Sequence, residues 1–376
     1  MVKKLVKKVV RNFFNEKACR YYKRSYRALL KHNQIPNKPC PNEEMWREKW
    51  GKLGRFNNAE YRLFSQYIGN NVNIIPEVLC KNLIEPILNP IRYRGCYTDK
   101  NFFDKLFEQG VLPRTLFRKM NGFYYNVGYD LILLHTTDQM QTILRNSGVS
   151  KIVVKPTIDT SSGNGVKLFG EYNGQWLDLD SGDTLTMEYL NNQYGDNFIV
   201  QECVEQHDSM SYYNSTSVNT LRLTVYRSVL TDACCIPNAY IRIGKNGALV
   251  DNAHAGGGFV GINSDGTLCN KVFDQYGGST TMFNEIDFNK EHKILNWDKV
   301  VEFAKYIGKQ IPHMRLLSLD IMIDKSGTPR LIEFNCNSYG VWAPQFTLGP
   351  AFGEYTDEII EYCKKNKNKA VRHLIF

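Results

Sequence analysis

Two short segments late in the chain, residues 319–323 and 331–335, are separated by a Ser-Gly turn sequence, and in them Asp320, Glu333 and Asn335 alternate with Leu319, Ile321, Ile332 and Phe334. This pattern predicts two antiparallel strands joined by a turn, because successive side chains of a strand point to opposite faces. Glu333 and Asn335 then share one face, and pairing of the strands can place Asp320 beside them. Three oxygen-bearing side chains on one face predict a site for a hard cation, Mg²⁺ or Mn²⁺, shared with phosphate oxygens and water.

A second cluster lies earlier in the chain, where an apolar strand at 152–155 ends in Lys155 and a loop of small residues leads into a second strand. Backbone N–H groups in such a loop can approach a triphosphate closely, and the lysine adds a positive charge. The loop is neither a Walker A sequence nor a dinucleotide-binding fingerprint, since a strand rather than a helix follows it. Its candidate phosphate-binding residues are Ser161, Ser162, Gly163 and Gly165.

The rest of the sequence predicts helices first and strands later. Residues up to about 75 are helical and aromatic-rich, and short helices and turns follow to 147, ending in an apolar strand at 130–135 and a capped helix. From residue 148 the pattern changes to strands and glycine turns. Further strands are expected at 166–169, 198–204, 221–229 and 239–243, and a helix at 298–311.

The positive charge of the chain is confined to its N-terminus. Residues 1–34 hold eleven Lys or Arg and one acid, a net charge of +10, whereas the remaining 342 residues hold 36 basic and 37 acidic side chains. Apolar residues recur every three or four positions in the first part of this segment, with lysines between them, which predicts an amphipathic basic helix. Nucleic acid is not an expected partner, because the body is nearly neutral and the basic residues form one terminal helix.

Two partners for this basic helix stay open. It can pack its apolar stripe on the body, or residues 1–34 can contact an anionic membrane surface. We favour packing, because Tyr21, Tyr22 and Tyr26 continue the helix into aromatic-rich sequence that needs a partner surface. The ten cysteines form no C-x-x-C pair, and the opening has no uninterrupted apolar segment typical of a signal peptide. We therefore expect reduced thiols and a cytoplasmic location, with peripheral contact at the inner face of the membrane as the alternative.

In this order and at this separation, the two clusters resemble the ATP-grasp superfamily, specifically its sugar-transfer-associated branch found among polysaccharide biosynthesis proteins. Two further stretches are similar to that branch, Asn-Thr-Leu-Arg at 219–222 and the glycine-rich segment 251–262. The resemblance covers about residues 95–350 and implies an α+β chain with the ATP-grasp fold, in which two α+β subdomains grip ATP. The expected divisions are a helical basic N-terminal extension (1–75), an N-terminal subdomain (76–147), a small grasp subdomain with the phosphate-covering hairpin and hinge (148–206), a large subdomain with the metal site (207–350) and a C-terminal helix (351–376).

The resemblance also implies roles for single residues. Lys100 and Lys155 would reach the nucleotide phosphates, and the segment around residue 202 is similar to the hinge that carries adenine. Asp320, Glu333 and Asn335 match the metal ligands of the family. The implied contacts to adenine and ribose are Gln201, Glu202, Val204 and Asp208, with Glu205 as the alternative to Asp208.

Arg222 and His254 complete the candidate catalytic residues with Lys155. The guanidinium of Arg222 is a planar fork suited to bidentate binding of a phosphate or a carboxylate. His254 lies in the glycine-rich segment, where a structural role and a role as general base both stay open.

The function implied by the resemblance is an ATP- and Mg²⁺-dependent carboxylate–amine ligase. Phosphoryl transfer from ATP to a carboxylate gives an acyl phosphate, which an amine then attacks. The expected substrates are an amino acid or amino sugar and a sugar-linked carboxylate, joined during synthesis of a capsule or another cell-surface polysaccharide. Two alternatives are a sugar kinase that uses the same site and a non-catalytic, nucleotide-binding subunit of a polysaccharide assembly complex.

Overall fold

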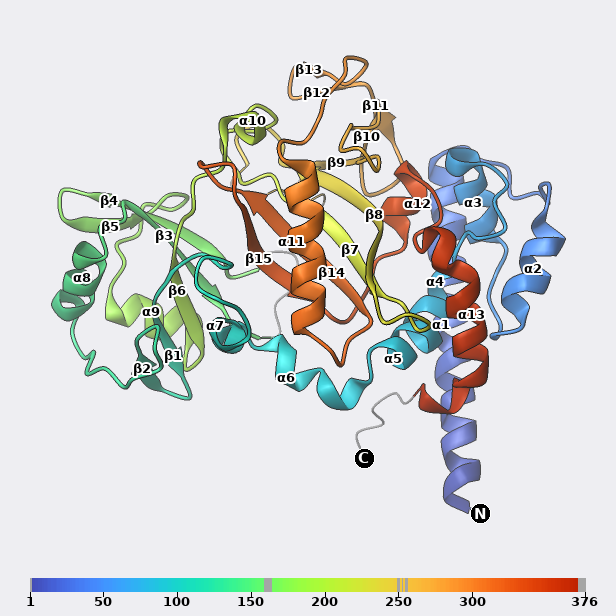
Figure 1. Cartoon of the computed structure of the whole chain (residues 1–376), viewed down its shortest axis with the longest axis horizontal. Coiled ribbons are helices and arrows are strands. Elements are labelled where there is room, and N and C mark those ends of the chain that lie inside the picture. Colours follow the sequence, from blue (N-terminus) through green and yellow to red (C-terminus); the bar gives the residue numbers. More distant parts are fainter. Residues whose placement is uncertain (1, 159–163, 249–250, 252, 254–255, 371–376) are drawn as a thin grey trace.

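The predicted hairpin forms one edge of a seven-stranded antiparallel sheet (Figure 1). The structure is a computed structural model and describes residues 2–158, 164–248, 251, 253 and 256–370. The strand order is β11-β10-β9-β8-β7-β14-β15. The strands are β7 (Leu221–Arg227), β8 (Cys234–Ile243), β9 (Gly258–Gly261), β10 (Val272–Phe273), β11 (Ser279–Thr280), β14 (Leu316–Ile323) and β15 (Pro329–Asn335).

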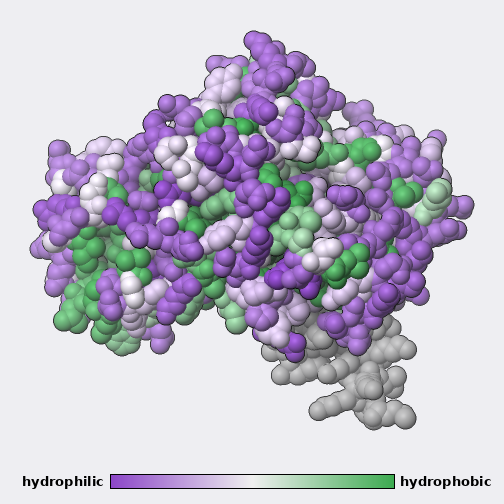
Figure 2. Space-filling model, in the orientation of Figure 1, coloured by the Kyte–Doolittle hydropathy of each residue, from purple (hydrophilic) through white to green (hydrophobic). Residues whose placement is uncertain are grey.

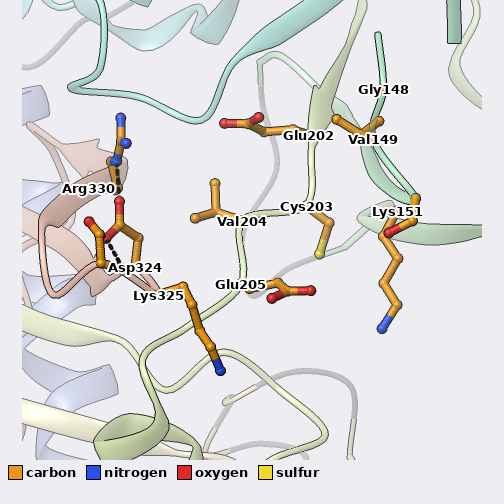
Figure 3. Close-up of a pocket in the computed structure, with 12 residues that line it drawn as sticks. Gly148, Val149, Lys151, Glu202, Cys203, Val204, Glu205, Asp324, Lys325 and Arg330 are labelled. Atoms are coloured by element: carbon orange, nitrogen blue, oxygen red, sulfur yellow. Dashed lines mark hydrogen bonds and ion pairs between the residues drawn. The ribbon is translucent and has the colours of Figure 1, made fainter. Parts of the chain in front are cut away.

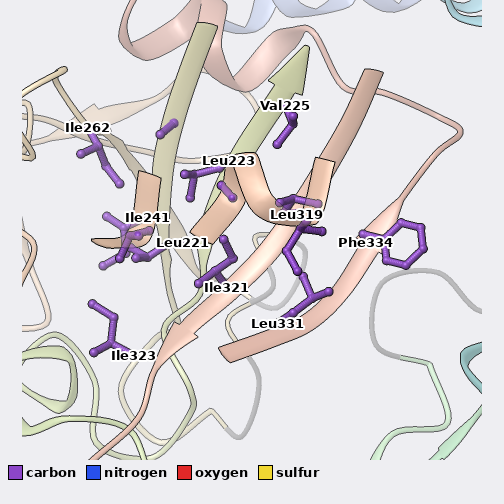
Figure 4. Packing of buried hydrophobic residues seen from close by; sticks show 14 of the residues in the cluster. Leu221, Leu223, Val225, Ile241, Ile262, Leu319, Ile321, Ile323, Leu331 and Phe334 are labelled. Carbon is purple, nitrogen blue, oxygen red and sulfur yellow. The ribbon is translucent and has the colours of Figure 1, made fainter. Parts of the chain in front are cut away.

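One face of this sheet packs on the long helix α11 (Trp297–Gln310). Apolar side chains that alternate along the strands, such as Leu221, Leu319 and Ile321, are completely buried in a single cluster with the apolar stripe of the helix (Figure 4). Because neighbouring residues of a strand point in opposite directions, the polar residues between them belong to the other face. The packing under α11 therefore fixes the position of that polar face.

The N-terminal and C-terminal helices form a second core on the right of Figure 1. Aromatic residues dominate it: the ring of Phe64 lies 5.7 Å from that of Tyr26 and 5.0 Å from that of Phe346. Tyr226 and Leu316, which oppose each other on β7 and β14, join this core from one end of the polar face. The helices concerned are α1 (Val2–His32), α2 (Glu43–Gly51), α3 (Ala59–Ile68), α4 (Glu77–Leu79), α5 (Glu85–Leu88), α12 (Trp342–Thr347) and α13 (Thr356–Lys365).

A six-stranded antiparallel sheet forms the lobe on the left of Figure 1. Its order is β2-β1-β6-β3-β4-β5, and apolar residues of two helices cover it in a third core. The predicted cap is confirmed, because Thr136 and Gln139 form a capping box at the start of α8. The elements are β1 (Thr115–Met120), β2 (Phe123–Tyr125), β3 (Lys151–Pro156), β4 (Lys167–Tyr172), β5 (Gln175–Asp178), β6 (Phe198–Glu202), α8 (Thr137–Asn146) and α9 (Met187–Tyr194).

The helix predicted at 298–311 is confirmed as α11. None of the described helices has the length and apolar content needed to cross a membrane.

Short elements connect these layers. The connecting elements are α6 (Gly95–Thr98), α7 (Phe103–Leu106), α10 (Asp208–Ser211), β12 (Met282–Phe283) and β13 (Ile286–Asp287).

The segment before residue 136 differs from the sequence prediction. The strand predicted at 130–135 is wrong, because Leu131 makes one isolated bridge to Tyr125 and no strand forms there. Only part of the apolar run is buried: Leu131 and Leu133 are exposed, whereas Leu134 joins the core of this lobe. Figure 2 shows apolar residues gathered over this lobe, at its lower left. The strands that do form, β1 and β2, come before residue 148, where the small subdomain was expected to begin.

Candidate active site

A row of charged side chains crosses three adjacent strands of the seven-stranded sheet. Arg222 of β7 lies opposite Asp320 of β14, and Asp320 lies opposite Glu333 of β15. Opposed residues of paired strands project from the same face, so all three lie on the face turned away from α11. The guanidinium of Arg222 holds Asp320 through two hydrogen bonds, of which Nη2 to Oδ2 measures 2.8 Å. The predicted catalytic arginine is thus bound to a predicted metal ligand.

Lys100 and Asn335 extend this row at Glu333. The Nζ of Lys100 lies 3.3 Å from Oε2 of Glu333, and Nδ2 of Asn335 donates to Oε1 at 3.2 Å. The backbone N–H of Lys100 donates to the carbonyl of Thr157, just after β3, at 3.0 Å. Lys100 therefore connects the metal-ligand candidates of the large sheet with the hairpin of the small one.

Asp320 is buried among positive charges. Burial alone would raise the pKa of its carboxyl, but the guanidinium groups of Arg222 and Arg242 act in the opposite direction and the net pKa is lowered. The Nη1 of Arg242 lies 3.8 Å from Oδ2 of Asp320. Asp320 is consequently an ionised carboxylate at neutral pH, as a ligand of a hard cation must be.

Lys155 brings a buried amine to the same region from the small sheet. Its side chain is almost completely buried at the end of β3. Burial, and then the positive charge of Lys100, lower the pKa of Lys155 to about 8, although Glu333 and Asp104 act to raise it. These four groups therefore share one electrostatic environment, in which an added anion would favour the charged lysine.

Sequence reasoning missed a second arginine on the polar face. Arg242 of β8 pairs with Asp251 at 2.7 Å, and the same carboxylate accepts a hydrogen bond of 3.0 Å from the backbone N–H of Thr220. This pairing holds the start of β7 next to β8, two residues before Arg222. The signal was present in the predicted strand 239–243, where Arg242 alternates with Ile241 and Ile243.

Several predicted loop residues have no described position. Ser161, Ser162, Gly163 and His254 lie outside the described residues. Gly165, also predicted, adopts a positive φ of 76°, and a Cβ on it would lie 2.8 Å from Cγ of Pro156. Only glycine fits this close approach where the hairpin returns to β3.

A cavity of about 420 Å³ lies beside the hinge after β6 (Figure 3). The predicted nucleotide-binding residues Glu202, Val204 and Glu205 line it from the small subdomain. Asp324 and Lys325 line it from the turn between β14 and β15, and Arg330 from the start of β15. Its lining contains neither Lys100 nor Lys155, nor any candidate metal ligand. The hinge cavity and the charged row are therefore separate parts of the region between the two sheets.

The predicted hinge residues have different neighbours. Gln201 is buried and its side-chain Nε2 donates to the carbonyl of Pro113 at 3.1 Å, on the side of β1. Glu202 accepts a hydrogen bond of 3.0 Å from the backbone N–H of Arg114. Asp208 is exposed and lies 2.5 Å from the Nζ of Lys325 at the cavity, whereas Glu205 lines the cavity directly. The two alternatives for the ribose contact thus both lie near the hinge cavity.

The donor set is chemically suited to Mg²⁺. Two carboxylates and one amide converge from adjacent strands, and all three offer oxygen, the ligand atom that Mg²⁺ prefers. Among the described residues, no group of three His, Cys, Asp or Glu side chains gathers as a metal site, so the amide of Asn335 is needed to complete the set. Water and phosphate oxygens would supply the remaining ligands.

A family model described as "Sugar-transfer associated ATP-grasp" matches residues 82–359, and the chain belongs to this family. The predicted family and the ATP-grasp fold are confirmed by this match. No curated protein shows significant similarity to the chain.

Three solved structures illustrate the likeness in fold. The ATP-grasp ligase PsnB, complexed with precursor peptide PsnA2 and AMPPNP, is 14% identical over 74% of this chain and 62% of its own, with a TM-score of 0.39. D-cycloserine synthetase DcsG is 14% identical over 74% of this chain and 73% of its own, with a TM-score of 0.38. The D-alanine-D-alanine ligase from Coxiella burnetii is 10% identical over 75% and 61%, with a TM-score of 0.39. The chain thus spans less than two thirds of the length of PsnB, and the likeness concerns the fold alone.

Proposed function

We propose that the chain is an ATP- and Mg²⁺-dependent ligase that joins a carboxylate to an amine through an acyl phosphate. One observation carries the proposal: Arg222, Asp320 and Glu333 form a single row, and Lys100 joins it from the segment that leads to the small sheet. Membership in the sugar-transfer-associated ATP-grasp family supports it further. The arrangement collects positive charge around a carboxylate pair, as transfer of a phosphoryl group requires.

The proposed chemistry needs positioning and charge rather than a side-chain nucleophile. A substrate carboxylate oxygen attacks the γ-phosphorus of ATP, the bond to the bridging oxygen breaks, and ADP leaves. The amine nitrogen then attacks the carbonyl carbon of the acyl phosphate, and inorganic phosphate leaves as the amine gives up a proton. Lys100, Lys155 and Arg222 orient the phosphates and stabilise the charge that develops on the transferred group.

Asp320, Glu333 and Asn335 would hold Mg²⁺, which supplies neutralisation of the charge on the phosphate oxygens. In the structure, Arg222 holds Asp320 and Lys100 holds Glu333. The phosphates of ATP offer both cations a new anionic partner, so the two carboxylates become free to bind the metal. We therefore propose that metal binds well only together with the nucleotide.

The finer proposal concerns the substrates: an amino acid or amino sugar and a sugar-linked carboxylate, joined in the cytoplasm during synthesis of a capsule or another cell-surface polysaccharide. Its support is the family, whose description links it to sugar transfer. A screen of amino acids, amino sugars and uronic acid derivatives for stimulated release of ADP tests it. Mass spectrometry of the product should show an amide.

Two results would replace this proposal. ADP released together with a stable phosphosugar, and no amide, would assign a sugar kinase to the same site. No substrate-dependent turnover, with retained ATP binding that responds to Glu333→Gln, would assign a non-catalytic nucleotide-binding subunit.

A further inference from the structure

The basic N-terminal helix packs on the body along one side only. Helix α1 is continuous from Val2 to His32, and its second half buries Tyr26 and Leu30 in the second core, which the N-terminal and C-terminal helices form. The hydroxyl of Tyr26 donates to Oε2 of Glu77 at 2.7 Å. Tyr22 is partly buried against the same core. These contacts define the inner face of α1.

The opposite face of this second half is basic and exposed. At 3.6 residues per turn, its six basic residues fall within about a third of the helix circumference. All six are exposed, and among the described residues none of them forms an ion pair. Glu16, the one acid of the first 34 residues, is paired instead with Arg55, at 3.8 Å. The six residues are Lys17, Arg20, Lys23, Arg24, Arg27 and Lys31.

The helical repeat shows which residues in the first half of α1 share a side with the basic residues of its second half. Residues eighteen apart lie five complete turns apart and therefore on the same side of a continuous helix. The side of α1 with the six exposed basic residues is its outer face. In the sequence, Leu5, Val6, Val9 and Phe13 precede Lys23, Arg24, Arg27 and Lys31 by this spacing of eighteen. Lys4 and Lys8 stand in the same relation to Tyr22 and Tyr26 of the inner face.

The apolar stripe of the first half therefore continues the exposed basic stripe and not the packed one. A helix that only docked on the body would keep its apolar positions in phase from end to end. Here they change sides between the two halves. Figure 1 shows that the N-terminal end of α1 extends beyond the other helices and strands.

We propose that the outer face of α1 docks on a bilayer that contains anionic lipid. A bilayer offers, within one surface, an acyl region for the positions from Leu5 to Phe13 and charged headgroups for the stripe from Lys17 to Lys31. A second copy of the chain would bring two basic stripes together and be repelled. Nucleic acid would use the basic stripe but leave the apolar positions without a partner. The proposal is independent of the ligase reaction.

Flotation of the full-length chain with vesicles tests this docking. The vesicles consist of phosphatidylcholine alone or with about one third phosphatidylglycerol, at low and high salt. We expect the chain to bind only the anionic vesicles and to be partly released by salt. Failure to bind anionic vesicles at low salt would overturn the proposal.

Three variants separate the proposed face from charge in general. Arg24→Gln with Arg27→Gln should weaken vesicle binding about thirtyfold. The matched control, Lys290→Gln with Lys299→Gln, removes the same charge from exposed positions outside α1 and should bind like the unaltered protein. Val9→Gln with Phe13→Gln keeps the charge and should also weaken binding.

Circular dichroism and thermal unfolding verify the fold of each variant, and ADP release should be unchanged in the double arginine variant. Equal losses in the arginine variant and its lysine control would overturn the proposal. So would competition by polyuridylate together with unaltered binding of the Val9 and Phe13 variant, which would assign the surface to a nucleic acid.

Discussion

The two faces of strands β7, β14 and β15 share one backbone but differ in almost every other respect. On one face, Leu221, Leu319 and Ile321 are completely buried under α11. On the other, Arg222, Asp320 and Glu333 form the charged row. The apolar face holds the strands in place, so the charged groups are positioned before any ligand arrives. Substitutions on the two faces should therefore affect different measurements.

The largest effect is expected on the charged face. Glu333→Gln removes one carboxylate from the candidate metal set and replaces the ion pair with Lys100 by a neutral contact. We expect ATP turnover to fall about 10²- to 10³-fold, as for the loss of other groups that stabilise a transition state by charge. The melting temperature should stay within a few degrees of the unaltered protein.

Glu291→Gln is the matched control, since Glu291 is exposed and lies outside the row. It should retain full turnover in an assay of ADP release. Equal activity of the two variants would show that the row is not the site of chemistry.

On the apolar face, Leu319→Ala should lower stability and leave the chemistry of the folded protein intact. Leu319 is completely buried, and truncating such a leucine costs about 3 kcal/mol of the free energy of unfolding. Denaturant unfolding measures this loss, with Leu230→Ala, at an exposed leucine, as the control. A large loss of nucleotide affinity in the folded variant would show that the two faces are not separable.

Lys155 predicts a pH dependence of nucleotide binding. Burial and the charge of Lys100 lower its pKa to about 8, below the value near 10.4 of an exposed lysine. The unbound protein loses this positive charge as the pH rises through 8, while phosphate bound nearby favours the charged form. Affinity for ATP should therefore fall roughly tenfold between about pH 7 and 9. Calorimetry in buffers of different ionisation enthalpy should show proton uptake on binding near the upper pH.

Lys155→Arg is the control for this prediction, because arginine keeps its charge throughout this range. Its affinity should change little with pH. The same pKa shift has a consequence for folding: the charged lysine is favoured in the unfolded chain, so stability rises as the pH increases from 8 to about 10. A pH profile shared by Lys155→Arg would assign the dependence to another group.

The smallest effect is expected for Lys100→Met. Removing this cation leaves Glu333 without its partner at 3.3 Å. Affinity for Mn²⁺ without nucleotide, measured by electron paramagnetic resonance, should rise a few-fold, while affinity for ATP should fall. Unchanged metal affinity in the absence of nucleotide would contradict the idea that Lys100 competes with the metal.

Alternation made most of the large sheet predictable. Apolar and polar residues alternate from Leu317 to Ile321 in β14 and from Ile332 to Asn335 in β15, and the register places Asp320 opposite Glu333. The same rule was less informative for β1, which includes Arg118 and Lys119 in its interior. Both are buried: Arg118 pairs with Asp104 at 2.5 Å, and Lys119 donates to Oδ1 of Asn191 at 2.8 Å. Sequence alone does not reveal partners so distant along the chain.

The contacts of the site were less predictable than its strands. The spacing that put Arg222 in the family motif gives no sign that it binds Asp320, because the two are 98 residues apart. The pairing of Arg242 with Asp251, nine residues further along, was also missed, because the sequence does not show how the chain turns back after β8. Sheet register, which only the folded chain shows, decides which charges meet.

The two bonds of Lys100 have a consequence for the timing of catalysis. Its backbone is tied to Thr157 near the small sheet, and its amine to Glu333 on the large one. The sheets cannot move apart without breaking one of these bonds. A nucleotide whose phosphates bind the amine of Lys100 would break its bond to Glu333 as the nucleotide enters. Departure of ADP would allow this bond to form again. Release of product and re-formation of the bond between Lys100 and Glu333 would then be one kinetic event, the kind of step that limits turnover in many enzymes.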